Sequence, residues 1–206
     1  MSCARAPQRR PVPTRPVRFT RAERGATAVE FALIAAPFIF MVFCIIEVGI
    51  YFMVQVTLDN ATAAAARELR TGQVVADGSS DKAGQQQFMT LVCSNMSWLQ
   101  SQCQSGVSSS TGTQYLVVDV RALGTYASNP SNPSLSGSGG QATGTCYYSG
   151  SAGSAVEMRA YYRWQLLTPY LMQAMQTFAG GVAELQSTEV FQVEPDGQTN
   201  PSGSTC

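Results

Sequence analysis

An apolar segment at residues 31–54 constrains this chain more than any other feature, because only Glu47 interrupts it. Residues 31–46 are sixteen uncharged residues, and a further apolar stretch follows Glu47. As a helix rising about 1.5 Å per residue, the segment spans about 36 Å, and a bilayer hydrocarbon core is about 30 Å thick. A helix buried in a globular core is seldom apolar on every face and also preceded by a tail as basic as residues 1–24. The segment therefore predicts one membrane-spanning helix.

Residues 1–24 are basic and directly precede this helix. They contain seven Arg and one acid, Glu23, so their net charge is +6 (7 − 1), and the remaining six basic and twelve acidic residues give −6. Positive charge beside a membrane helix holds that end in the cytoplasm. Basic tails also bind nucleic acid. The four prolines and the adjoining apolar segment favour an orientation signal instead, and we expect no nucleic-acid partner.

The helix is expected to continue beyond the membrane, from about residue 26 to residue 70. A cleaved secretory signal needs small residues soon after a short apolar region, whereas the stretch "NATAAAAR" begins only at Asn60. Four residues of this second half recur at helical spacing on one face: Leu58, Ala61, Ala65 and Leu69. Gly72 supplies a C-terminal stop. This half is predicted to be amphipathic and to lie outside the lipid.

Three residues of the apolar helix are unusual for a membrane segment. Pro37 removes a backbone donor and predicts a kink that membrane helices tolerate. Glu30 and Glu47 are seventeen residues apart, about 25 Å along a helix. A carboxylate in hydrocarbon is costly unless it is paired, neutral or functional. One interpretation places each glutamate at a membrane interface with no partner, and the role of Glu47 stays open.

Beyond Gly72 the sequence predicts a small α+β domain. The stretch "QQQFMTLVCSNMSWLQ" shows helical spacing through residue 99, and residues 169–178 fit a short helix. The stretches "QYLVVDVRAL", "AVEMRAYYRWQLL" and "STEVFQVE" have the β-branched and aromatic residues typical of strands. The Ser-, Gly-, Asn- and Pro-rich residues 124–153 are predicted as a loop. Three strands with short helices indicate a largely antiparallel sheet.

Cysteine usage is typical of an oxidising compartment. Four cysteines follow the membrane segment: Cys93, Cys103, Cys146 and Cys206. They allow three disulfide pairings that the sequence does not separate, and the short loop makes Cys93 with Cys103 the first expectation. Zinc is the rival interpretation, but its ligand pairs usually stand closer together and the chain has no His to complete a mixed site. We therefore expect disulfides and no metal.

The residues show no pattern typical of catalysis. The chain lacks His, the usual base for a Ser or Cys nucleophile, and its carboxylates form no convincing pair. No glycine loop with Lys is present to hold a phosphate. The aromatic residues Tyr161, Tyr162 and Trp164 could form a binding surface, but alternating strand packing is favoured. We expect neither enzymatic activity nor a cofactor.

The words "RGATAVEFALI", "IIEVG" and "VQVTLDNATAAAAREL" resemble the TadE-like family of minor pseudopilins in tight-adherence (Tad/Flp) pilus systems. The resemblance is close from Arg24 to Gly72 and extends through "LVVDVRA", "YYRWQLLTP" and "LQSTEVFQVEP". Pilin-like precursors have a glycine before the cleavage site and a glutamate fifth after it, and Gly25 and Glu30 match this spacing. The resemblance implies that a prepilin peptidase cuts between Gly25 and Ala26. It also implies that Glu30 pairs with the new amine of a neighbouring subunit.

These observations predict four regions: a basic leader and candidate for cleavage at 1–25, a TadE-like transmembrane helix with an extramembrane extension at 26–71, an exported α+β domain at 72–195, and a flexible tail at 196–206. The expected location is the bacterial inner membrane, with a single pass, the N-terminus in the cytoplasm and the domain in the periplasm. The resemblance implies a structural component of Tad/Flp pilus biogenesis and secretion. Its implied partners are the prepilin peptidase, other pilin-like subunits and Tad assembly proteins. The alternatives are an uncleaved bitopic protein with a ligand- or surface-binding domain, and a tethered envelope enzyme.

Overall fold

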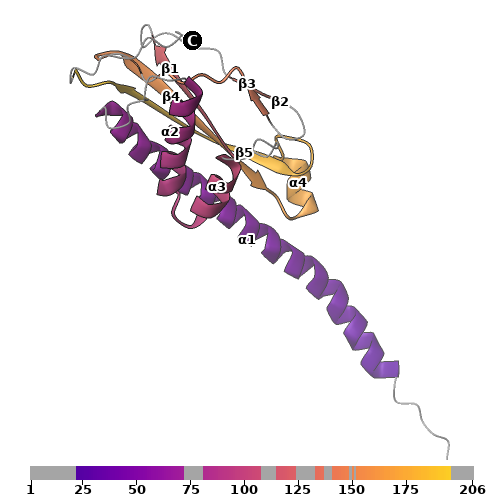
Figure 1. Cartoon of the computed structure of the whole chain (residues 1–206). Helices are drawn as coiled ribbons and strands as arrows, with labels where there is room; N and C mark the ends of the chain where they lie inside the picture. Colours follow the sequence, from indigo (N-terminus) through magenta and orange to yellow (C-terminus); the bar gives the residue numbers. More distant parts are fainter. Residues whose placement is uncertain are drawn as a thin grey trace, which may run out of the picture. The chain divides into compact units, whose positions relative to one another are not determined.

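The computed structural model of the protein describes residues 22–71, 81–107, 115–123, 133–136, 141–148, 150 and 152–195. It confirms the predicted α+β class: a long apolar N-terminal helix is followed by a small domain with an antiparallel three-stranded sheet and short helices (Figure 1). The chain divides into two compact units, Met1–Val42 and Phe43–Cys206. The core of the second unit includes residues on both sides of the predicted domain boundary at residue 72.

Helix α1, Ala22–Arg70, is the long helix that the sequence predicts. Pro37 lies inside it and the helix continues on both sides, while the kink expected there stays a prediction. The apolar face of the second half is confirmed, because four predicted residues are almost completely buried: Leu58, Ala61, Ala65 and Leu69. Gly72, the expected stop, lies outside the described residues. The second half of α1 is therefore part of the domain core.

The main sheet contains β1 (Leu116–Leu123), β4 (Ala155–Gln165) and β5 (Val182–Gln192) in the order β1-β4-β5. Both pairings are antiparallel, and Tyr162 stands opposite Leu116 on one side and Leu185 on the other. All three predicted strands are confirmed. β4 ends at Gln165, before the predicted end, and β5 begins at Val182, before the predicted start.

One face of this sheet packs against α1 and α2 (Asp81–Asn95) to form the core. Alternate residues of β1 and β4 reach this face and are buried: Leu116, Val118, Val120, Val156, Met158, Ala160 and Tyr162. Tyr161 is also buried, although it points to the opposite face. The predicted packing role of Tyr161 and Tyr162 is confirmed, and Trp164 is partly buried against the core.

The predicted helix at residues 85–100 is divided in the structure. α2 ends at Asn95, and a short 3-10 helix, Ser97–Leu99, leads into α3, Gln100–Val107. The division lies at Ser97, whose φ of 46° is left-handed and cannot continue an α-helix. The apolar spacing nevertheless identified core residues on both sides of the division: Phe88, Val92, Met96 and Leu99.

Two expectations about connecting segments are wrong. Residues 124–153 are not only a loop, because β2 (Ser134–Ser136) pairs antiparallel with β3 (Gln141–Thr143), and Tyr147 bridges to Val120 of β1. Backbone pairing needs no apolar side chains, so the composition concealed it. Helix α4, Pro169–Met175, ends before the predicted residue 178, since Gln176 is extended and Phe178 instead bridges to Val182.

Two buried tyrosines are expected to make the stability of the domain sensitive to alkaline pH. Burial raises the pKa of Tyr147 and of Tyr162 to about 12, with Tyr115 adding to the effect on Tyr162. The ordinary value is about 10, so the folded state favours the neutral phenol. This stabilisation is complete below pH about 10 and is lost as the pH rises through about 12. We expect the urea midpoint of the domain to fall steeply over that interval.

The matched control for the alkaline prediction is Tyr170→Phe, since Tyr170 is exposed. Neither the Tyr147 nor the Tyr162 hydroxyl has a hydrogen-bond partner in the described chain, so a Phe at either position removes no such bond. Tyr147→Phe and Tyr162→Phe should each flatten the pH dependence, and Tyr170→Phe should leave it unchanged. Equal slopes in all three variants would contradict the assignment.

Candidate membrane and assembly site

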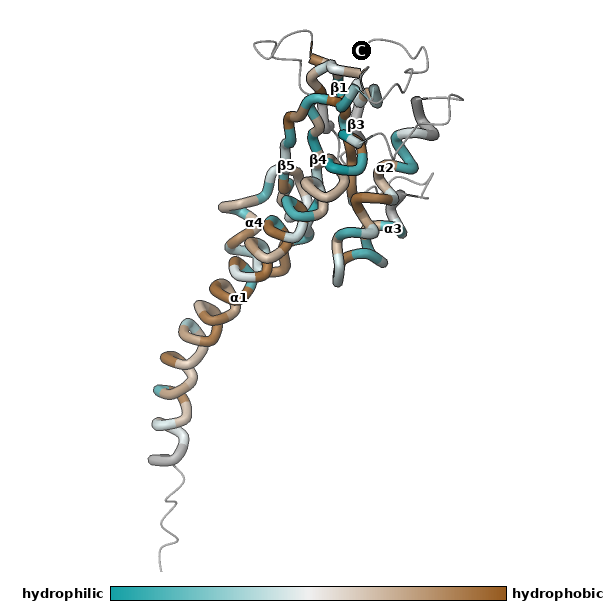
Figure 2. The backbone as a smooth tube through the Cα atoms, turned by 90° about the vertical axis from the view of Figure 1, so that its left-hand side faces the viewer, coloured by the Kyte–Doolittle hydropathy of each residue, from teal (hydrophilic) through white to brown (hydrophobic). Residues whose placement is uncertain are grey.

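The candidate site lies on α1, whose first half carries its apolar side chains outward. One helix of the described chain, at 25–70, is long and apolar enough to cross a membrane. Large apolar side chains are exposed along it from Val29 to Val56. Figure 2 shows the hydrophobic colour that runs along this helix. In water this surface would be costly, at about 25 cal/mol per Å² of apolar area. The helix therefore fits a bitopic membrane protein.

The residues of the predicted cleavage motif lie at the start of this helix. Gly25, Ala26 and Glu30 are all helical and exposed. A Cβ added to Gly25 would meet no atom within 4 Å, so the fold itself does not require glycine there. Among the described residues, Glu30 has no hydrogen-bond or ion-pair partner.

Glu47, the second acid of the helix, is held inside the chain. Its side chain accepts hydrogen bonds from the backbone N–H groups of Leu167 and Thr168 and from the Thr168 hydroxyl. The residue is only 6% exposed. An interface glutamate without a partner, one of the interpretations of the sequence, does not describe this arrangement. The contact joins α1 to the turn that precedes α4, and the sequence separation of about 120 residues explains why spacing could not reveal it.

Further polar contacts fix α1 along β5, which runs in the same direction. The Gln55 side chain donates to the Gln186 carbonyl at 3.0 Å. At the end of the helix, the Glu194 N–H donates to the Arg70 carbonyl at 3.2 Å, and the two side chains form an ion pair at 3.1 Å. These contacts, with Glu47 at the other end, define the register of α1 on the domain.

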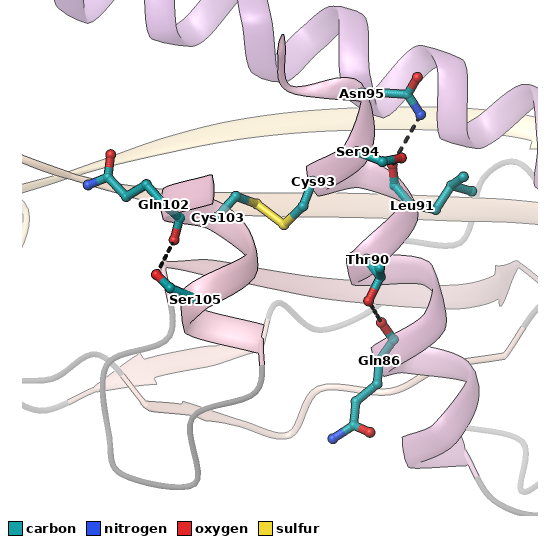
Figure 3. Close-up of a disulfide and its surroundings, with 9 residues drawn as sticks. All are labelled: Gln86, Thr90, Leu91, Cys93, Ser94, Asn95, Gln102, Cys103 and Ser105. Carbon is teal, nitrogen blue, oxygen red and sulfur yellow. Dashed lines mark hydrogen bonds between the residues drawn. A yellow bond between two sulfur atoms is a disulfide. The ribbon is translucent and has the colours of Figure 1, made fainter. Parts of the chain in front are cut away.

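The predicted disulfide between Cys93 and Cys103 is present and joins α2 to α3 (Figure 3). The two Cα atoms are 5.4 Å apart, within the range for a disulfide. Cys146 is also disulfide-bonded. Cys206 lies outside the described residues. Cys44, in the candidate membrane-spanning segment, is a free thiol. Within the described ranges, no group of three or more His, Cys, Asp or Glu residues could hold a metal ion.

The sheet face opposite the core carries charged residues that sequence reasoning did not identify as a group. Arg121 forms an ion pair with Asp119 at 2.8 Å, and Arg159 forms one with Glu157 at 2.8 Å. Opposite charges also face each other across the strands, since Asp119 stands opposite Arg159 and Glu157 opposite Arg121. The alternation in "VDVRAL" and "VEMRAYYRW" carried this signal, because residues two apart share a face.

The contacts of this charged face tie neighbouring segments to the sheet. Asp119 accepts the Cys146 N–H at 2.8 Å, and Arg121 donates to the Gly144 carbonyl at 2.6 Å, so the pair holds the segment beside β1. Burial lowers the pKa of Arg163, and Glu184 opposes that shift. Burial raises the pKa of Glu184, and Arg163 opposes that shift. Each charge thus offsets part of the effect of burial on the pKa of the other.

Together, the exposed apolar helix and the domain packed on its second half fit a bitopic protein with one membrane helix. Residues 25–67 match the family model described as TadE-like protein. This is the family that the sequence words resemble, and it is a family of pilus components. The matched residues begin at Gly25 and end in the part of α1 that packs on the sheet. No curated protein and no solved structure matches the chain.

Proposed function

We propose that the protein is a minor pseudopilin of a Tad/Flp pilus system that acts by lateral packing of α1 with other pilin-like helices. The observation that carries this proposal is the contrast between its two helix carboxylates. Glu47 is satisfied inside the chain, whereas Glu30 has no polar partner among the described residues. A carboxylate in hydrocarbon gains most from an ammonium partner. A neighbouring subunit can supply that partner at its processed N-terminus.

The geometry of a helix supports pairing between subunits. Cleavage after Gly25 creates an amine at Ala26, which lies four residues, or about 6 Å, before Glu30 along the helix. A parallel neighbour displaced by about one turn, about 5.4 Å, brings its amine level with Glu30. The pairing thus sets both the orientation and the axial offset of adjacent subunits.

The charge distribution and the position of the domain along the chain support the proposed topology. Seven Arg precede the helix, so the N-terminus is proposed to stay in the cytoplasm, where a prepilin peptidase removes residues 1–25. The domain then lies in the periplasm, an oxidising compartment compatible with the Cys93–Cys103 disulfide. There it contacts Tad assembly proteins or takes its place in the pilus.

The test is the intact mass of the full-length protein co-expressed with a prepilin peptidase. We expect an N-terminus at Ala26 for the natural sequence and an uncut chain for Gly25→Arg. Because Gly25 has free space around its Cα, the variant should keep the urea midpoint of the domain. An uncut natural chain in the presence of active peptidase would overturn the processing step.

Cross-linking between neighbouring subunits tests the pairing role of Glu30 separately from cleavage. Glu30→Gln should leave cleavage and domain stability intact and lower the yield of cross-links between neighbouring subunits several-fold, because the amide carries no charge. Equal cross-linking in Glu30→Gln and the natural protein would refute the ion pair. An uncleaved protein that forms no such cross-links would favour a tethered binding module.

A further inference from the structure

The segment that connects β4 to β5 has an unusual composition for a connection in water. Between Arg163 and Glu184 the sequence contains no Asp, Glu, Lys or Arg. Helix α4 lies within this segment, at the end of the sheet where β4 ends and β5 begins (Figure 1). Where such an uncharged segment exposes a contiguous apolar patch, the patch marks a contact with a protein or a membrane.

Two large side chains of this segment point away from the folded unit. Leu167 is 78% exposed, more than any large apolar side chain of α1, and Tyr170 is 71% exposed. Neither is needed to fill the core, because Leu166 beside them is buried and occupies it. The local sequence thus presents apolar surface outward at one defined place.

The segment makes hydrogen bonds on the side facing the sheet. The Leu166 N–H donates to the Gly181 carbonyl at 2.8 Å, and the Gln165 side chain donates to the Gly180 carbonyl at 2.9 Å. Gly181 has a φ of 78°, and a Cβ there would lie 2.8 Å from the Met172 sulfur. The exposure of Leu167 and Tyr170 is therefore a property of a packed element.

Glu47 fixes this segment at one level of α1. Its carboxylate accepts the N–H groups of Leu167 and Thr168, and apolar side chains of α1 are exposed within one turn of it, at Phe43, Ile46 and Ile50. A hydrocarbon core of about 30 Å takes about 20 helical residues. A core that begins at Glu30 therefore ends close to Ile50. Glu47, with the Leu167 N–H bonded to it, lies three residues before that outer end.

We propose that Leu167 and Tyr170 form a second membrane contact, inserted at the headgroup and acyl boundary of the bilayer that α1 crosses. The inference rests on the membrane-spanning role of α1 in the proposed function. Lipid is the partner that fits, because Glu47 joins Leu167 to a part of α1 whose neighbouring apolar side chains are exposed, and the segment carries no charge to direct a protein. Tyrosine is favoured at this depth, where its ring is apolar and its hydroxyl reaches water.

The proposed membrane contact also explains why the Glu47 carboxylate is hydrogen-bonded inside the chain. Near hydrocarbon an uncompensated carboxylate is costly, and so are backbone N–H groups without an acceptor. The Glu47 contact satisfies both at once and places Leu167 toward lipid. In this proposal the chain meets the membrane both through α1 and through the segment before and within α4.

The test uses the full chain in vesicles of phosphatidylethanolamine and phosphatidylglycerol. Single cysteines replace Leu167, Tyr170, Val190 and Phe38, one at a time, in a background with Cys3→Ser and Cys44→Ser and intact disulfides. Each is labelled with an environment-sensitive fluorophore and quenched by spin-labelled lipid. Val190, exposed on β5, is the matched water-facing control, and Phe38 on α1 is the hydrocarbon control.

We expect several-fold stronger lipid quenching and blue-shifted emission at residues 167 and 170 than at residue 190. Quenching at residues 167 and 170 as weak as at residue 190, with strong quenching at residue 38, would overturn the second contact alone. Weak quenching at residue 38 as well would overturn the membrane-spanning role on which the inference rests. Protection of residues 167 and 170 that depends on protein density and not on lipid quencher would assign the surface to a second protein and also overturn the inference.

Discussion

Replacing Leu58 by Ala is expected to lower the free energy of unfolding of the domain by about 3 kcal/mol, the usual cost of a cavity in a packed core. Leu58 lies on α1 and is 0% exposed in the shared core. A loss of this size is a large fraction of the stability of a small domain. Urea denaturation in detergent measures it, with the fluorescence of Trp98 and Trp164 as the signal.

The matched control for Leu58 is Val56→Ala on the same helix. Val56 is 58% exposed, so its truncation leaves no cavity and should change the midpoint little. If both substitutions had the same small effect, the second half of α1 would be a linker and not part of the core. Independent folding of a chain that begins at residue 72 would contradict the prediction as well.

Replacing Glu47 by Ala is expected to cost about 2–4 kcal/mol, because the backbone N–H groups of Leu167 and Thr168 lose their acceptor. The change should appear first as local loosening of α4, since the carboxylate holds the residues before that helix. Hydrogen exchange at residues 167–175 detects this loosening, and urea denaturation gives the total loss.

Two further variants separate the contributions at this contact. Thr168→Val removes only the hydroxyl donor and keeps both backbone bonds, so it should cost about 1 kcal/mol. Glu47→Gln keeps one carbonyl acceptor and should lie between the other two variants. Unchanged exchange at α4 in Glu47→Ala would show that the contact does not hold the helix.

Much of the fold follows from local patterns. The long helix was predictable because a run of apolar residues and an alanine-rich face both have helical spacing, and Leu58 and Leu69 are buried as expected. The three strands were predictable because β-branched residues alternate within them. The β2–β3 pair was missed because its Ser and Gln residues have low strand propensity and only backbone pairing defines it.

In the candidate site, too, some features could be predicted from the sequence and others could not. Gly25 and Glu30 could be identified as candidates from the sequence because the motif is defined by their spacing along one helix. The Asp119–Arg121 and Glu157–Arg159 pairs left a two-residue alternation in the strands, but only the register of β1 and β4 places the opposite charges together. Sequence patterns indicate which residues share a face and not which strands are neighbours.

The sequence alone determined that this protein has a basic N-terminus, one long apolar helix, an α+β domain and a TadE-like motif. Hydrophobicity, charge and helical spacing are local patterns of a few residues, so a single sequence is enough to identify them. Only the tertiary structure decided the role of Glu47, because its acceptor atoms meet donors from residues 167 and 168. The same packing left Leu167 exposed next to the Glu47 contact. Contacts between residues so distant in sequence depend on the folded path of the chain, which no local pattern encodes.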